Sequence, residues 1–274
     1  MFERFLTFVV VGMLLAVMNF TPKSWLPNTK TKLADLWFDL NGIAVPAGAA
    51  TDTSFGSSRF FDDFLGDTIN TDNYAVLADT GGTAYAINLQ GGGVIRGIGD
   101  GTNGDLTNIF GPAIWLPSSG GPLTLEIRAN WRTSVADGEN FFGFSDASTD
   151  ENPLLVSTTD VLTSAASNAA GFVYTGAGTA NWKAVSVNAD SDGTVVACNQ
   201  TGVVTTPVVG TWQTFKIVIN TDGDADFYID GVWQAREDLA VATGTLLNWG
   251  ACQQDGGTGR STDIDYVYIS GGRV

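Results

Sequence analysis

The chain of 274 residues contains no histidine, and this absence excludes several kinds of active site. Histidine is the commonest general base, it completes the Ser-His-Asp triad, and it is a ligand in most zinc sites. With only two cysteines, Cys198 and Cys252, the chain also lacks the material for a disulfide framework or a zinc knuckle. The two thiols either pair, if their strands are neighbours, or stay free and buried, and both alternatives remain open at this stage.

Charged residues are also scarce, since they make up only 15% of the chain, and basic residues are fewer than acidic ones. Residues 1–58 hold four basic and four acidic residues, so residues 59–274, with nine basic and 25 acidic ones, carry the whole net charge of −16. A surface this acidic repels phosphate groups, so we expect no nucleic-acid partner. The same acidity favours solubility and is compatible with cation binding.

Turn-forming residues and alternating side chains are abundant, with glycine alone at 34 positions. Residues 211–236 show the pattern most clearly, since apolar and polar side chains alternate there around Asp222-Gly223 and Asp230-Gly231. Alternation of period two around Asp-Gly turns is the strongest short-range signal for antiparallel hairpins. This part of the chain is therefore predicted to be β-structure.

Further strand candidates follow one another from residue 59 to the end, separated by turns. They are Phe60–Phe64, Tyr74–Ala78, Ala84–Leu89, Gly93–Ile98, Leu123–Trp131, Asn140–Ser145, Ala170–Tyr174, Trp182–Val187, Thr194–Asn199, Gln213–Asn220, Asp224–Ile229, Gly231–Ala235, Leu246–Cys252 and Asp263–Ser270. One short stretch, Thr159–Asn168, has a pattern compatible with a helix. So many short strands and no fixed repeat predict an all-β domain over residues 59–274, a two-sheet antiparallel jelly-roll sandwich.

The first 22 residues form a different kind of segment, because Phe5–Phe20 contains no charged residue. A cleaved signal peptide is one reading, although Glu3 cancels the positive start and no small-residue cleavage site follows. A membrane span through residues 5–20 is the second reading, although a span needs about 17–25 apolar residues. We favour the third, a retained hydrophobic helix over residues 1–22 that packs in an assembly or serves as an anchor.

Residues 23–58 are predicted to be an extended arm with one short amphipathic helix over Lys30–Leu40, whose apolar residues fall at helical spacing. The small polar residues 47–58 then form a linker. An apolar helix and an arm ahead of a β body are a common layout in proteins that dock into a larger structure. The residues predicted to mediate assembly are Phe5, Phe8, Leu14, Leu15, Phe20, Trp25, Leu36 and Trp37.

Three motifs give the body a family resemblance. An FDDF strand begins at Phe61, a TWQTFKI…DGDADFYIDG stretch spans Thr211–Gly231, and DIDYVYIS closes the body at Asp263–Ser270. Together they resemble the concanavalin A-like (laminin-G-like) lectin/glucanase superfamily, over residues 59–274. The DDFLGD stretch at Asp62–Asp67 is also similar to the opening strand of jelly-roll domains in tailed-phage virion proteins. The resemblance implies the sandwich fold, and it leaves lectin, glycosidase and structural roles open, because this fold carries all three.

The sequence supports no catalytic assignment, and we expect the protein not to be an enzyme. A glucanase of this superfamily carries a Glu-x-Asp-x-x-Glu pattern on one strand, which this chain lacks. Retaining hydrolysis needs two carboxylates about 5–5.5 Å apart. The best available pair is Asp263 and Asp265, which we interpret as structural or hydrogen-bonding residues.

Two kinds of binding site remain as hypotheses. Lectins of this fold often use calcium, and Asp222, Asp224 and Asp226 alternate as in a calcium loop, although the hairpin turn alone also explains them. No other cofactor is expected. For glycan stacking, the candidates are Trp115, in a loop rich in glycine and proline, and Trp182, which follows a Gly-Ala-Gly-Thr loop. Four other tryptophans lie in or beside strands and are predicted to be core: Trp131, Trp212, Trp233 and Trp249.

Two functions are compatible with these features. The first is a non-enzymatic structural virion protein, a capsid decoration or head/tail-associated protein that docks on other virion subunits through residues 1–58 and forms a homo-oligomer. Its β body would project outward and bind surface glycans weakly. The alternative is a carbohydrate-binding, lectin-like module at a bacterial cell surface or outside the cell, anchored or secreted through residues 5–20.

Overall fold

The computed structural model describes residues 58–272, apart from positions 67, 80–81, 89–92, 120, 134, 136–137, 150 and 177–180. The predicted hydrophobic helix, the arm before Ser58 and all the predicted assembly residues lie outside this range. From Ser57 onward the chain forms one compact unit, which begins close to the predicted boundary at residue 59. In the part of the chain that the structure describes, no helix is long and apolar enough to span a membrane.

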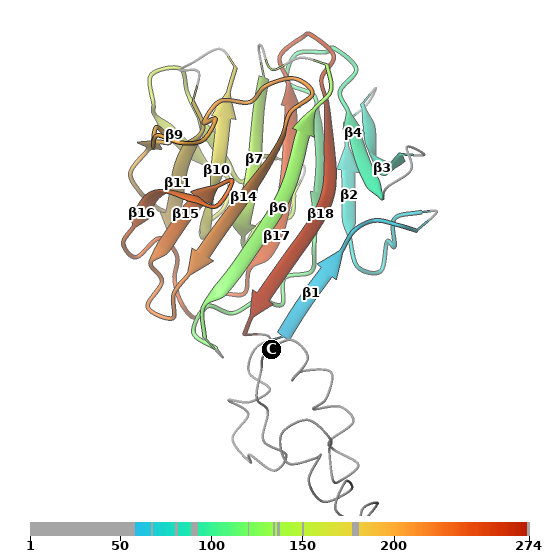
Figure 1. Ribbon diagram of the computed structural model, residues 1–274. Helices are drawn as coiled ribbons and strands as arrows, with labels where there is room; N and C mark the ends of the chain where they lie inside the picture. Colours follow the sequence, from blue (N-terminus) through green and yellow to red (C-terminus); the bar gives the residue numbers. More distant parts are fainter. Residues whose placement is uncertain are drawn as a thin grey trace, which may run out of the picture. The chain divides into compact units, whose positions relative to one another are not determined.

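Two antiparallel sheets of eight strands each make up the body (Figure 1). The first sheet contains β1 (Ser58–Asp62), β3 (Thr83–Asn88), β4 (Val94–Ile98), β6 (Leu123–Trp131), β14 (Trp212–Ile219), β15 (Ala225–Ile229), β16 (Val232–Glu237) and β18 (Ser261–Gly271). Its strand order is β16-β15-β14-β6-β18-β4-β3, with β1 paired to β18.

The second sheet lies behind the first in Figure 1. It contains β2 (Ala75–Ala78), β5 (Leu106–Phe110), β7 (Gly138–Ser145), β10 (Ala169–Thr175), β11 (Lys183–Asn188), β12 (Ser191–Asp192), β13 (Val196–Ala197) and β17 (Asn248–Asp255). Its order is β12-β11-β10-β7-β17-β5-β2, with β13 paired to β11. A separate two-stranded sheet joins β8 (Leu154–Val156) to β9 (Leu162–Ser164).

The predicted all-β, two-sheet antiparallel sandwich is confirmed, but one helix was predicted where the structure has β9, and three further strands, β5, β8 and β12, were not predicted. The helix predicted at Thr159–Asn168 is wrong, because this stretch contains β9 between two turns. Strand β5 was missed because all five of its residues are buried, so its sequence shows no alternation.

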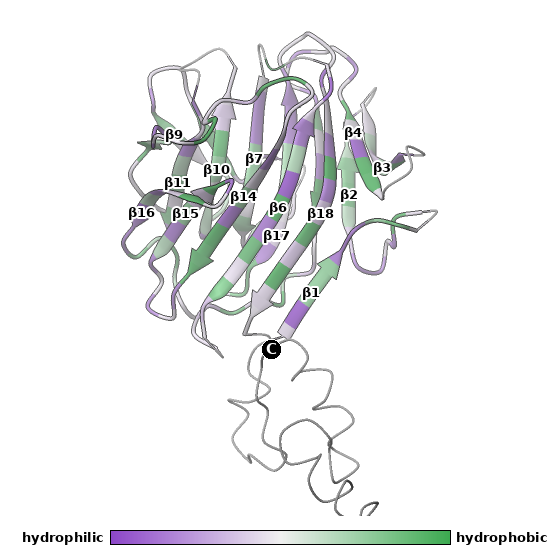
Figure 2. Ribbon diagram, in the orientation of Figure 1, coloured by the Kyte–Doolittle hydropathy of each residue, from purple (hydrophilic) through white to green (hydrophobic). Residues whose placement is uncertain are grey.

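The main core lies between the two sheets and is built from the alternating residues of both. Figure 2 shows this alternation as green and purple bands along β6, β14 and β18. At its centre the rings of Trp131, Phe142, Trp182 and Phe215 lie 4.6–6.2 Å apart, and each of these residues is fully buried or nearly so. Such aromatic pairs contribute about 0.5–1.5 kcal/mol each beyond the area that they bury.

A second core lies on the other face of the second sheet. There the segment that carries β8 and β9 covers the sheet, and its buried members are Phe110, Phe141, Leu154, Val156, Leu162, Ala166, Ala169, Val173, Val185, Val187 and Cys252. Cys198 belongs to the main core instead, so the two thiols are free and do not pair. Burial raises the pKa of both, for Cys198 to about 12.

Two facing glycines leave space for the second core. Gly143 of β7 lies opposite Gly171 of β10, and the ring of Phe141 lies over both. A Cβ atom on Gly143 would come within 2.4 Å of the Ala170 carbonyl oxygen, and one on Gly171 within 2.4 Å of the Phe141 ring. The aromatic layer therefore depends on glycine at these two positions.

Candidate functional site

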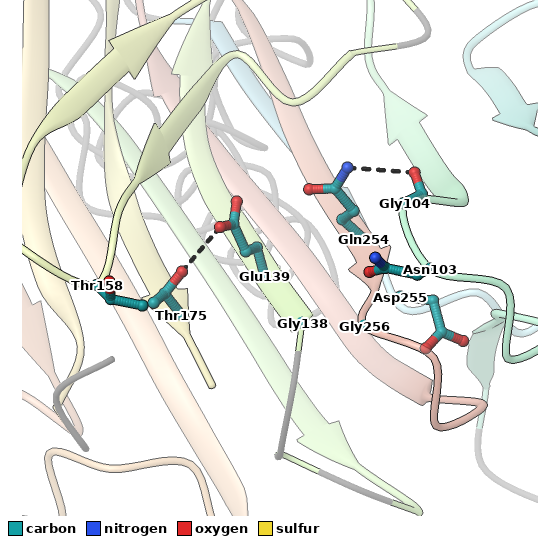
Figure 3. Close-up of a pocket in the computed structure, with 9 residues that line it drawn as sticks. All are labelled: Asn103, Gly104, Gly138, Glu139, Thr158, Thr175, Gln254, Asp255 and Gly256. Atoms are coloured by element: carbon teal, nitrogen blue, oxygen red, sulfur yellow. Dashed lines mark hydrogen bonds between the residues drawn. The ribbon is translucent and has the colours of Figure 1, made fainter. Parts of the chain in front are cut away.

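An open cavity lies on the outer face of the second sheet, beside the β8–β9 segment, which contributes Thr158 to its lining (Figure 3). Its floor is one cross-strand row, in which Thr175 of β10 lies opposite Glu139 of β7, and Glu139 lies opposite Gln254 of β17. The cavity has a volume of about 490 Å³, which is within the range of small-molecule sites. It is lined by Asn103, Gly104, Gly138, Glu139, Thr158, Thr175, Gln254, Asp255 and Gly256.

Glu139 is the carboxylate at the centre of this row. The hydroxyl of Thr175 donates a hydrogen bond of 2.9 Å to Glu139 Oε1, drawn as a dashed line in Figure 3. Oε2 is buried and has no hydrogen-bond partner among the described residues. Burial raises the pKa of Glu139, and the Thr175 hydrogen bond and the charge of Arg260 oppose that effect only in part. One oxygen of this carboxylate is therefore hydrogen-bonded to Thr175, and the other has no partner in the described part of the chain.

The neighbouring side chains offer complementary polar atoms. Gln254 donates from Nε2 to the Gly104 carbonyl at 3.1 Å, which holds its amide along the cavity wall. A second, smaller cavity of about 210 Å³ also has Gln254 in its lining, together with Leu106, Asn152 and Leu155. The two cavities therefore adjoin at Gln254.

Asp255 is the other carboxylate in the lining, and its role is structural. Four backbone N–H groups donate to it, from Gly101, Gly257, Thr258 and Arg260, at 3.0–3.2 Å. Burial acts to raise the pKa of Asp255, but these hydrogen bonds outweigh it and leave the pKa lowered. In Figure 3 its carboxylate points away from Glu139, so the two acids do not form a pair across the cavity.

Both tryptophans predicted to contact glycans are buried, so that prediction is wrong. Trp115 is 2% exposed and pairs with Leu247 as an isolated β-bridge. Trp182 is fully buried, with its indole N–H donating to Gln213 Oε1 at 3.3 Å. Of the tryptophans predicted to be core, Trp131 and Trp249 are fully buried. The prediction is wrong for Trp233, which is 45% exposed, and for Trp212, which is only half-buried and lies under the Arg128 guanidinium.

The three aspartates of the predicted calcium loop do not form a metal site. Asp224 and Asp226 both pair with Arg236, the latter at 3.1 Å, and Asp222 is exposed. Among the described residues no group of three or more acidic, cysteine or histidine side chains is placed to hold a metal ion. The alternation of these acids instead reflects the hairpin turn and an ion pair with the neighbouring strand.

Asp263 and Asp265, interpreted from the sequence as structural or hydrogen-bonding residues, both form ion pairs. Asp263 pairs with Arg96 at 2.5 Å, and Asp265 with Arg128 at 2.5 Å. A bulge between Ile264 and Tyr266 separates the two acids, so each meets its own arginine on the first sheet.

Sequence reasoning missed Glu139 and Gln254 because the predicted strands were too short. The strands were expected to begin at Asn140 and to end at Cys252, whereas β7 begins at Gly138 and β17 ends at Asp255. Period-two alternation with Phe141, extended back by two residues, would have put Glu139 on the outer face. No sequence signal indicates which strands become neighbours, so the cross-strand row of Thr175, Glu139 and Gln254 could not be predicted.

Comparison with known proteins supports the fold. No protein-family model matches the chain, and neither does any curated protein. The structure is similar to the Emp47p carbohydrate recognition domain, with a TM-score of 0.55 at 11% identity over 80% of this chain and 98% of that one. It is also similar to lectin UEA-II in complex with galactose (TM-score 0.52, 10% identity, 78% and 98% covered) and to the Bacillus licheniformis β-glucanase (0.51, 10%, 77% and 97%). The body therefore has the concanavalin A-like lectin/glucanase jelly-roll fold.

Proposed function

We propose that the protein is a glycan-binding module that does not hydrolyse its ligand, and that the cavity at Glu139 is its binding site. The observation that carries the proposal is the polar row of Thr175, Glu139 and Gln254 along an open cavity, with one acceptor oxygen of Glu139 unpartnered among the described residues. A hydroxyl, a carboxylate and an amide in line offer sugar hydroxyl groups both donors and acceptors. The similar lectin UEA-II is in complex with galactose, and the similar domain of Emp47p is a carbohydrate recognition domain by name, which agrees with this proposal.

The arrangement of acids favours binding over hydrolysis. Phe141 occupies the next position on the face of β7 that carries Glu139, so no second carboxylate follows there. Asp255, the other acid in the lining, is occupied by backbone N–H groups. Hydrolysis with retention or inversion requires two carboxyl groups on either side of the scissile bond. An acidic body also disfavours anionic sugars, so the expected ligands are neutral oligosaccharides.

Replacing Glu139 with glutamine is expected to weaken glycan binding about tenfold or more, because a hydrogen bond to a charged acceptor contributes about 1.5–3 kcal/mol. The amide keeps the shape of the side chain and can still accept from Thr175. The measurement is binding of the full-length chain to an array of neutral oligosaccharides, namely β-glucan, galactan and N-acetylhexosamine oligomers, followed by titration of the best ligand.

The matched control is Asp72→Asn, which makes the same change from carboxylate to amide in an exposed turn that does not line the cavity, and it should leave the affinity unchanged. Equal affinity of wild type and Glu139→Gln would place the binding site elsewhere. Release of reducing sugar by the wild type, lost in Glu139→Gln, would show that the cavity is an active site.

A structural role in a virion is the second candidate, and the sequence of residues 1–58 is the observation that favours it. The apolar stretch Phe5–Phe20 and the arm precede an acidic β body, a layout suited to docking on neighbouring subunits. Burial of apolar side chains there would stabilise the assembly by about 25 cal/mol per Å². Glycan binding by the body is compatible with this role.

Deletion of residues 1–40 is expected to abolish incorporation into particles while the β body keeps its fold. The measurement is the amount of protein that co-sediments with purified particles, with circular dichroism of the free truncated chain as the folding control. Incorporation at the wild-type level would remove the docking role from this segment.

A further inference from the structure

The outer face of the first sheet carries a row of large side chains that crosses six strands. In this face the residues that point away from the core meet in register, each directly opposite the next. The row is Trp233 (β16), Tyr228 (β15), Lys216 (β14), Glu126 (β6), Tyr268 (β18) and Phe61 (β1). Its two ends are the most exposed, with Phe61 at 60% and Trp233 at 45%.

Further aromatic and arginine side chains flank this row. Arg128 lies over the ring of Trp212 at 5.0 Å, and the ring of Tyr266 lies 5.9 Å from that of Phe61. The hydroxyl of Tyr266 donates to Glu126 Oε1 at 2.7 Å. Tyrosine, tryptophan and arginine are the residues enriched in protein–protein interfaces and among their energetic hot spots.

Charge distinguishes this face from the remainder of the body. Six of the nine basic residues after position 58 lie on it or pair with an acid on it, namely Arg59, Arg96, Arg128, Arg132, Lys216 and Arg236. By the same criterion six acids belong to this face, namely Glu126, Asp224, Asp226, Asp238, Asp263 and Asp265, so its charges balance. The negative charge of the body therefore lies on its other surfaces, and two copies can meet at this face without the repulsion that the others impose.

The order of the row is self-complementary. Read from either end it runs aromatic, aromatic, charge, charge, aromatic, aromatic, with Lys216 and Glu126 at the centre. A two-fold axis parallel to the strands, between β14 and β6, would place Lys216 of one copy over Glu126 of the other, and aromatic rings over aromatic rings. Isologous interfaces require this property, because the same patch must fit itself.

The dimensions suit a reversible dimer. Six strands about 4.8 Å apart span roughly 24 Å, and the outward positions from Trp212 to Val218 add roughly 20 Å along the strands. Two such patches would bury about 1,000 Å² in total, which is the range of weak, transient complexes. We infer that the protein forms a reversible two-fold dimer through the outer face of its first sheet, with Lys216 and Glu126 pairing across the axis.

The test uses charge reversal in the full-length chain and sedimentation velocity over a concentration series. Lys216→Glu and Glu126→Lys, each alone, bring like charges together twice per dimer and are expected to weaken association at least ~100-fold. An equimolar mixture of the two variants should recover a dimer, because each variant now carries the sign that the other lacks. A control, Asp72→Lys, changes the same charge at an exposed position in a turn and should associate like the wild type.

The mixture separates the proposal from a folding defect. Lys216 and Glu126 are also neighbours within one chain, so each single reversal costs some stability, and thermal unfolding followed by circular dichroism measures that cost. An intrachain effect would persist in the mixture, whereas an interchain contact is restored there. A wild type that is monomeric at every concentration overturns the proposal, whether the face is bare or covered by the chain's own first 57 residues. A dimer that both reversals leave intact overturns it as well.

Discussion

Replacement of Trp182 with alanine is expected to lower the free energy of unfolding by about 3–5 kcal/mol, the usual cost of removing a large aromatic side chain from a core. Trp182 is fully buried, and its ring lies 4.6 Å from Phe215, 5.2 Å from Trp131 and 5.5 Å from Tyr174. The substitution also leaves Gln213 Oε1 without the indole N–H that donates to it. Because domains are stable by only about 5–15 kcal/mol, this single change should remove much of the total.

Thermal unfolding followed by circular dichroism measures the effect, which for a domain of this size should lower Tm by roughly 10 °C. Trp233→Ala is the matched control, because the same change at a side chain that is 45% exposed should cost less than about 1 kcal/mol. Similar losses for the two variants would contradict the placement of Trp182 at the centre of the core. A Trp182→Ala protein that stays folded and loses only glycan binding would revive the idea that this residue contacts the ligand.

Replacement of Asp255 with alanine is expected to cost about 3 kcal/mol or more, because four backbone N–H groups lose a charged acceptor together. These donors belong to two loops, at Gly101 and at Gly257–Arg260, which Asp255 joins at the edge of the cavity. Asp255 and Gly256 also line the cavity, so weaker glycan binding should accompany the loss of stability.

The same carboxylate predicts a dependence on pH. The pKa of Asp255 in the folded protein lies below its ordinary value of about 3.9, so its contribution is complete above that pH and is lost as the pH falls through the lower, folded value. The difference in stability between wild type and Asp255→Asn should therefore be constant from pH 7 to pH 5 and shrink on further acidification. Chemical denaturation at each pH measures it. A difference that grows on acidification would contradict this assignment.

The sequence predicted a strand correctly wherever that strand buries only one of its faces. Strand β14 alternates buried and half-buried residues along its whole length, and its predicted and observed bounds differ by only one residue at each end. Strand β5 has no such alternation because the main core lies on one side of it and the second core on the other. Periodicity carries no information in that case, so the missed strand follows from its position in the layers.

The candidate site could not be predicted from the sequence, because it is assembled from strands that are distant in the sequence. Glu139, Thr175 and Gln254 become neighbours only through the order β10-β7-β17, which no local pattern encodes. The exposure of the two candidate glycan-binding tryptophans was wrongly predicted for a related reason. Loops rich in glycine suggested exposure for Trp115, yet the backbone there pairs with Leu247 and carries the side chain into the core.

The separation of the two thiols has a practical consequence. Cys198 lies between the sheets, and Cys252 lies under the β8–β9 segment, so each is an internal reporter for one layer. A part of a protein with few buried contacts can open locally at a lower free-energy cost than global unfolding requires. If an alkylating reagent modifies Cys252 faster than Cys198, the β8–β9 segment opens locally while the two main sheets stay packed. The two native cysteines therefore report this opening without an engineered label.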